Sequence, residues 1–102
     1  MPASPASVAS RVVGERFRER RLELGSSQEE VAHLAGLNMS NYGKIERGLS
    51  NPTMHTLVRI AAVLDIDPGT VIAGLTADDL PPGDEAYTVQ DFIRERQSRA
   101  SR

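Results

Sequence analysis

SQEEVAHLAGLNMSNYGKIERGLSN, residues 27–51, is the stretch that decides the fold of this chain. Its pattern predicts two short helices separated by a glycine turn. Ser27 and Glu30 have the spacing of a capping box, in which each side chain accepts a backbone N–H at the start of a helix. Gly36 can adopt the left-handed conformation of a helix end, and Asn38 is a favourable N-cap for the second helix. Because isolated helices of about two turns are marginally stable, other segments must pack against this pair.

The remaining segments predict further helices and no alternating strand pattern. Val13 and Phe17 begin a stripe at helical spacing that continues to Leu24, before Gly25. Arg16 and Arg20 lie on the same predicted helix, where a solvated face is the ordinary interpretation. The inward positions expected in the other helices are Val31, Ala32, Ala35, Tyr42, Ile45, Leu57, Ile60, Ala61, Leu64, Val71 and Ile72. We therefore expect an all-α domain with five helices, at residues 8–24, 28–35, 39–47, 54–64 and 68–73.

Composition excludes several classes of protein and site. The 102 residues include no Cys, so disulfides, thiol nucleophiles and Cys-ligated zinc are absent. No apolar run approaches the roughly 18 residues of a membrane span, and no signal-peptide pattern opens the chain, so we expect a cytoplasmic protein without a membrane partner. The net charge of −2 hides a segregation, because residues 1–64 hold eight Lys or Arg against six Asp or Glu, whereas residues 65–86 hold six acids and no base.

Composition also suggests the boundaries of the domain. Residues 1–7 predict a flexible arm, 8–75 a helical domain, 76–86 an acidic linker, 87–98 a C-terminal helix and 99–102 a disordered tail. In the C-terminal helix, Thr88 and Asp91 have cap spacing, and Phe92 has little use in a free tail. This helix either folds back onto its own domain or packs on a second copy to form a dimer.

A catalytic or cofactor site has little support in the sequence. His33 and His55 are the only histidines, and each lacks a metal-ligating partner at a suitable spacing. No glycine-rich phosphate loop follows a strand. We expect no enzyme, no metal and no cofactor.

Several motifs in a fixed order resemble the Cro and phage-repressor (Xre-type) family of helix-turn-helix proteins. They are Leu24-Gly25, SQEEVA at 27–32, AGL at 35–37, IERG at 45–48, Pro52-Thr53, Thr56-Leu57 and Ile60-Ala61. The resemblance covers residues 13–75. It implies a five-helix repressor-like bundle in which the third helix lies in the major groove of double-stranded DNA.

The resemblance also implies which residues contact DNA. Lys44 would donate to guanine, Ser40 would pair with several bases, and Met39 would pack on a thymine methyl group. Gln28 would reach a phosphate at the start of the second helix, and the loop after the third helix would bind another phosphate. The complete set is Gln28, Asn38, Met39, Ser40, Asn41, Lys44, Ser50 and Asn51.

Three further features bear on this surface. The resemblance implies a largely buried ion pair between Arg21 and Glu46 that fixes the tilt of the third helix. Gly43 lies inside that helix and is disfavoured there by roughly 1 kcal/mol relative to Ala, so it either permits close approach to the DNA backbone or softens the helix. The exposed face lacks long bidentate donors, so DNA shape and half-site spacing would contribute to specificity.

The leading hypothesis is a sequence-specific transcriptional regulator, such as a repressor, acting as a homodimer on a near-palindromic operator. The alternative is an antitoxin-like interaction module whose extension at residues 76–102 binds a partner protein. A third reading is a helical domain that has lost contact with DNA, which would suit the acidic net charge.

Overall fold

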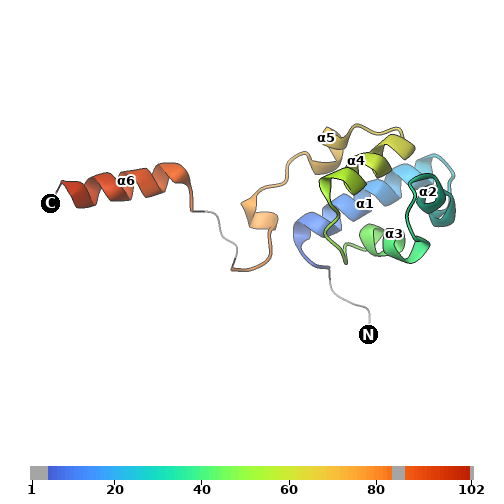
Figure 1. Ribbon diagram of the computed structural model, residues 1–102, viewed down its shortest axis with the longest axis horizontal. Coiled ribbons are helices and arrows are strands. Elements are labelled where there is room, and N and C mark those ends of the chain that lie inside the picture. Colours follow the sequence, from blue (N-terminus) through green and yellow to red (C-terminus); the bar gives the residue numbers. More distant parts are fainter. Residues whose placement is uncertain (1–4, 84–86, 102) are drawn as a thin grey trace.

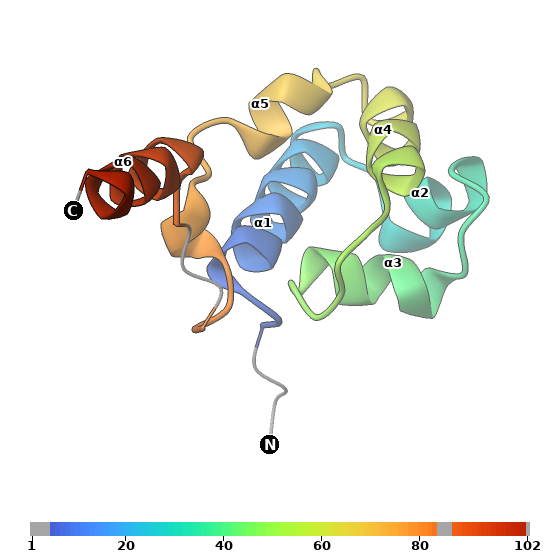
Figure 2. The same cartoon turned by 60° about the vertical axis from the view of Figure 1, so that its left-hand side comes forward.

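The computed structural model describes residues 5–83 and 87–101, and within them every regular element is a helix (Figures 1 and 2). The predicted all-α class is therefore confirmed. Five helices form one domain, and a short 3₁₀ helix and a sixth α-helix follow it. The elements are α1 Val8–Glu23, α2 Gln28–Leu34, α3 Met39–Glu46, α4 Met54–Val63, α5 Pro68–Ile72, η1 Ala77–Asp79 and α6 Val89–Ala100.

Local capping chemistry sets where the helices begin. The hydroxyl of Ser27 accepts the N–H of Glu30, and the carboxylate of Glu30 accepts the N–H of Ser27, which completes the predicted capping box. Thr53 caps α4, and Asp67 caps α5 with a proline at its first helical position. The predicted starts of α2 to α5 agree with the structure because each depends on residues within one turn.

The core lies where the five helices meet, and its largest members are fully enclosed. The buried apolar residues are Val13, Phe17, Val31, Ala32, Ala35, Tyr42, Ile45, Ile60, Ala61, Leu64 and Val71. Two residues expected on inward stripes are instead 49% exposed, Leu24 and Ile72. Leu24 is the C-cap of α1, beyond its last turn, and Ile72 ends the single turn of α5, so neither is covered by a neighbouring helix.

Gly14 allows α1 to pack directly against the backbone of α3. A Cβ added at Gly14 would lie 2.3 Å from the carbonyl oxygen of Ile45 and 2.6 Å from that of Glu46. No side chain fits between the two backbones at this point. The position of α3 relative to α1 is therefore fixed by backbone contact.

Two arginines of α1, for which a solvated face was the ordinary interpretation, bind the carboxyl ends of other helices. Arg20 donates through Nε to the carbonyl of Leu64 at 2.9 Å, at the end of α4. Arg16 donates through Nη1 to the carbonyls of Val71 and Ala73, at 3.0 and 2.7 Å, at the end of α5. Because the last carbonyls of a helix have no partner within it and carry partial negative charge, these guanidinium groups anchor both helices to α1.

The segments at both ends differ in part from expectation. Ala6, placed in a flexible arm, donates its N–H to the carbonyl of Gly48 at 2.8 Å, whereas residues 1–4 lie outside the described residues. The C-terminal helix was expected to end at residue 98, but α6 includes Arg99 and Ala100. Residues 84–86 of the predicted linker and residue 102 of the predicted tail lie outside the described residues.

Helix α6 stands apart from the five-helix domain (Figure 1), and all its residues are exposed.

None of the helices in the described ranges is long and apolar enough to cross a membrane.

Candidate nucleic-acid interface

The turn between α2 and α3 presents the start of α3 to solvent. Gly36 has φ of +68°, a conformation that a side chain would disfavour. Asn38 then caps α3, because its side-chain oxygen accepts the N–H of Ser40 at 2.8 Å and that of Asn41 at 3.4 Å. The carbonyl group of this side chain is thus committed to the helix, and only its NH₂ group is free to contact a ligand.

The predicted contact residues of α3 lie on the solvent-facing half of the helix. Met39, Ser40 and Lys44 are exposed and form a row on the solvent-facing half of α3, because at 3.6 residues per turn Ser40 lies roughly 100° from Met39 and roughly 40° from Lys44. Tyr42 and Ile45 face the core from the opposite side. The other predicted contact residue of this helix, Asn41, is also exposed and lies roughly 60° from Lys44, at the edge of this row.

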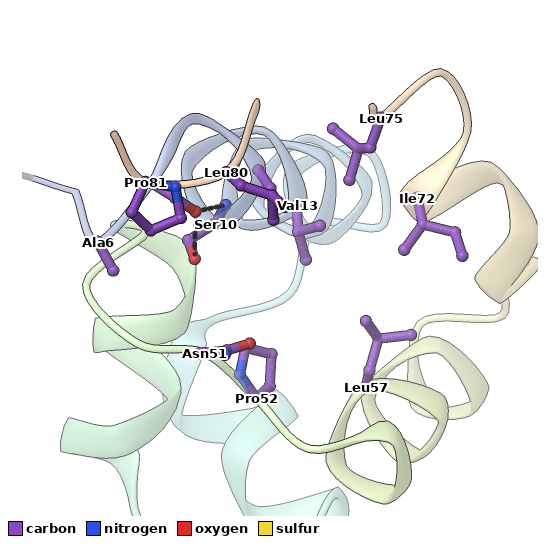
Figure 3. A pocket seen from close by; sticks show the side chains of 12 residues that line it. Ala6, Ser10, Val13, Asn51, Pro52, Leu57, Ile72, Leu75, Leu80 and Pro81 are labelled. Carbon is purple, nitrogen blue, oxygen red and sulfur yellow. Dashed lines mark hydrogen bonds between the residues drawn. The ribbon is translucent and has the colours of Figure 1, made fainter. Parts of the chain in front are cut away.

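The loop after α3 is placed differently from this row. Ser50 is half-buried and Asn51 is exposed, and Asn51 lies with Pro52 at the rim of a cavity of about 270 Å³ (Figure 3). The lining of this cavity is mostly apolar and includes Val13, Leu57 and Leu75. It holds no acid–base pair, so it does not resemble a catalytic site.

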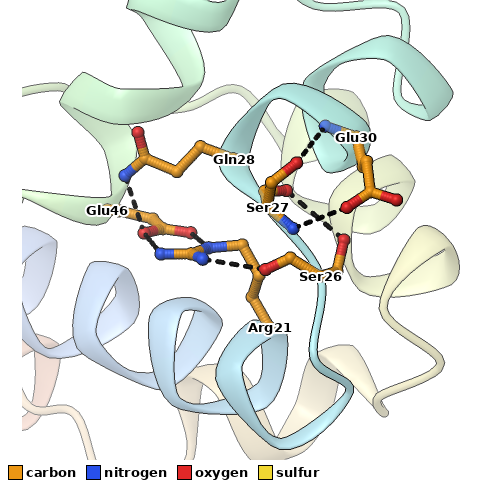
Figure 4. A network of polar contacts seen from close by, with 6 residues as sticks. All are labelled: Arg21, Ser26, Ser27, Gln28, Glu30 and Glu46. Carbon is orange, nitrogen blue, oxygen red and sulfur yellow. Dashed lines mark hydrogen bonds and ion pairs between the residues drawn. The ribbon is translucent and has the colours of Figure 1, made fainter.

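Arg21 and Glu46 form a two-point ion pair between α1 and the end of α3 (Figure 4). Nε of Arg21 donates to one carboxylate oxygen of Glu46 at 2.7 Å, and Nη2 donates to the other at 2.9 Å. Nη1 of Arg21 also donates to the carbonyl of Ser26 at 2.9 Å. The two residues are only 8% and 4% exposed, so solvent screens this pair weakly.

Gln28 is joined to the same carboxylate. Its Nε2 donates to Glu46 at 3.0 Å, across the α2–α3 unit (Figure 4). One amide N–H of Gln28 is therefore used inside the protein, and the second remains for an external acceptor such as a phosphate. The sequence signal for this contact was absent, because nothing within one turn links Gln28 to Glu46.

Burial and hydrogen bonding act in opposite directions on the acid of this network. Burial alone would raise the pKa of Glu46, but interactions with neighbouring side chains, above all the hydrogen bond from Arg21, outweigh it, so the pKa lies below its ordinary value. Hydrogen bonding to Glu46 raises the pKa of Arg21. The hydroxyl of Tyr42 is buried beside the pair without a hydrogen bond of its own, and burial raises the pKa of this phenol. The site is therefore a fixed ion pair with no group poised to exchange a proton near neutral pH.

Two residues that were not assigned to the interface, Gly43 of α3 and its C-cap Arg47, lie on the exposed row. Gly43 falls between Met39 and Arg47 at helical spacing, and the exposed Arg47 side chain folds back over it. The spacing of four between Gly43 and Arg47 was the signal available in the sequence. His33 and His55 are exposed, and the residues described contain no cluster of ligands for a metal ion.

Comparisons with known proteins match the region that builds this surface. A family model described as helix-turn-helix matches residues 17–71, just over half of the chain. The transcriptional regulator SinR of Bacillus subtilis is 37% identical over 62 residues, which are 60% of this chain and 56% of SinR. The chain thus spans about half the length of the curated relatives it matches.

Solved structures match the same region. The restriction-modification controller protein C.AhdI of Aeromonas hydrophila has a TM-score of 0.59 and 39% identity, with 61% of this chain and 94% of that chain covered. A structure of SinR in complex with DNA has a TM-score of 0.55 and 38% identity, covering 58% and 95%. A complex of SinR with the protein SinI has a TM-score of 0.58 and 28% identity, covering 88% and 99%.

Proposed function

Because this chain belongs to the helix-turn-helix family, we propose that it is a sequence-specific DNA-binding transcriptional regulator that acts as a homodimer on a near-palindromic operator. The third helix would enter the major groove, and Met39, Ser40 and Lys44 would contact base edges. Gln28 and the loop at Ser50 and Asn51 would bind phosphates. A cytoplasmic location and the absence of catalytic activity belong to the same proposal.

The observation that carries the proposal is the exposed row of α3 on a rigid support. Backbone contact at Gly14 and the buried Arg21–Glu46 pair hold α3 against α1. Contacts to bases require side chains held in a fixed register on the duplex, which such a support provides. The related SinR has been solved in complex with DNA, which favours the same use of this surface here.

A dimer is proposed because one copy offers too small a surface for tight binding. One recognition helix reads a few base pairs, and proteins of this class gain affinity by binding two half-sites about one helical turn apart. The chain also leaves apolar residues uncovered, among them Met54 and Val58 of α4 and Phe92 of α6. These are candidates for contacts between copies.

Selection of bound sequences from random DNA tests the proposal directly. We expect one enriched motif, present as two inverted half-sites, and an affinity that falls steeply with salt. Lys44→Ala and Gln28→Ala should each weaken binding to the selected site. Arg18→Ala is the matched control, because Arg18 is exposed on α1 and belongs to no ion pair within the described residues. Absence of any enriched motif would refute the function, and unchanged affinity of both variants would refute the site.

The second candidate is an antitoxin-like module in which the C-terminal extension binds a partner protein. It is favoured by the exposed apolar residues of α6, since Tyr87, Val89 and Phe92 are each more than half exposed. The match to the SinR–SinI complex covers 88% of this chain and thus extends beyond the five-helix domain. Co-purification with a defined partner that Phe92→Asp abolishes, while DNA binding persists, would support this function. Purification of the chain from its native host without any bound partner protein would count against this function.

A further inference from the structure

We infer that Arg47 is a base-reading residue of the recognition surface that contacts a guanine, and that Gly43 forms the slot in which its side chain lies. The inference rests on the proposed DNA-binding function. Arg47 supplies a bidentate hydrogen-bond donor, which the row of Met39, Ser40 and Lys44 lacks.

The side chain of Arg47 lies along α3 rather than beyond its end. Arg47 is the C-cap of α3, and side chains at the end of a helix lean toward its N-terminus. Its Nη1 lies 3.0 Å, and its Cζ 3.8 Å, from the position that a Cβ of Gly43 would occupy. The guanidinium of Arg47 therefore lies about one helical turn before its own Cα, toward the N-terminus of α3. It reaches the part of α3 whose exposed residues face the proposed groove.

Gly43 is the reason that this position is available. The residue lies on the exposed row, yet it is buried, because the side chains of Arg47 and Gln28 cover it. The Oε1 of Gln28 lies 3.5 Å from the same Cβ position. No backbone of another helix approaches Gly43 in this way, in contrast to Gly14. A glycine that is unfavourable inside a helix is thus explained by the space it leaves for two polar side chains.

The donors of Arg47 are not used inside the protein. Arg16 and Arg20 donate to carbonyl groups, and Arg21 donates to Glu46. No side-chain hydrogen bond or ion pair of Arg47 occurs within residues 5–83 and 87–101, so its five N–H groups remain unpaired. A planar guanidinium can donate to O6 and N7 of guanine together, whereas the ammonium of Lys44 acts as a point donor.

The experiment compares variants on the site that the wild-type protein selects and on sites with each base pair changed singly. Arg47→Ala should weaken binding to the selected site roughly ten- to a hundredfold and should remove discrimination at one G·C pair. Arg47→Lys should recover part of the affinity without the discrimination. Arg18→Ala removes the same charge from α1 and should preserve both. Equal weakening on every site would show a phosphate contact instead, and unchanged binding would show no contact; either result overturns the inference.

Gly43→Ala gives a second, independent measurement. The added methyl group should displace the guanidinium and weaken binding several-fold, without lowering the melting temperature. In the Arg47→Ala background the same change should have no further effect, because the remaining neighbour, the Oε1 of Gln28, lies at an ordinary contact distance of 3.5 Å from the new Cβ. An equal loss in both backgrounds would overturn the role of the slot. Failure of the wild-type protein to select any sequence would instead refute the proposed function itself.

Discussion

Substitution of Gly14 by alanine should separate α1 from α3. The new Cβ would lie 2.3 and 2.6 Å from two backbone oxygens of α3, those of Ile45 and Glu46. Close contacts between carbon and carbonyl oxygen are ordinarily about 3.3–3.6 Å. The two helices must therefore move apart by about 1 Å. Neither oxygen belongs to a flexible side chain, so the strain cannot be relieved by a change of rotamer.

Two opposing effects decide the magnitude. Alanine is favoured over glycine in a helix interior by about 0.8–1.0 kcal/mol. Overpacking of a tight contact costs about 1–3 kcal/mol, and backbone strain of this size belongs at the upper end. We expect a net loss of about 2 kcal/mol at Gly14. For a domain of this size that corresponds to a decrease of roughly 8–16 °C in melting temperature.

Thermal and urea unfolding of Gly14→Ala measure this loss, and Gly43→Ala is the matched control. The control makes the same chemical change in a helix, but its Cβ meets mobile atoms of Arg47 and Gln28. It should leave the melting temperature unchanged or raise it by the gain in helix propensity. Because α3 moves with the strain, Gly14→Ala should also weaken DNA binding below its melting temperature. A melting temperature of Gly14→Ala at or above that of the wild type would refute the packing argument.

Three further perturbations test the support of the surface. Glu46→Gln leaves Arg21 buried without its anion and should lower the free energy of unfolding by about 3 kcal/mol, toward the lower end of the range for buried pairs; an unchanged urea midpoint would contradict this. Burial acts to raise the pKa of Glu46, but the interaction with Arg21 lowers it by more, so the pKa in the folded chain lies below its ordinary value of about 4.5. As the pH falls below that value, the unfolded chain therefore binds more protons than the folded chain. Wild-type stability should therefore decline with acid below that pH more steeply than that of Glu46→Gln. Arg16→Ala should lower the free energy of unfolding by about 1–2 kcal/mol, because the carbonyls at the end of α5 lose their hydrogen-bond donor. The amides of α5 should then exchange faster in Arg16→Ala than in Arg18→Ala. Asn38→Ala should cost about 1 kcal/mol through loss of the α3 cap, and a variant with wild-type unfolding would show that the cap is dispensable.

The sequence alone determined the features that depend on neighbours within one helical turn. The cap at Ser27, the glycine turn at Gly36 and the cap at Asn38 were each predicted at the residue where the structure has them. The inward positions Phe17, Tyr42 and Ile60 followed from helical periodicity, which any helix must obey. These signals are local, so no knowledge of the packed structure was needed.

Only the tertiary structure decided which distant groups meet. Gln28 reaches Glu46 across 18 residues of sequence, and Arg16 reaches Ala73 across 57. The exposure of Ile72 and the backbone contact at Gly14 likewise depend on where a second helix lies. A pattern within one segment states which face is apolar, but it does not state what covers that face or which carbonyl a long side chain finds. The burial of Gly43 shows the same limit, because the Gln28 side chain that helps to cover it comes from α2.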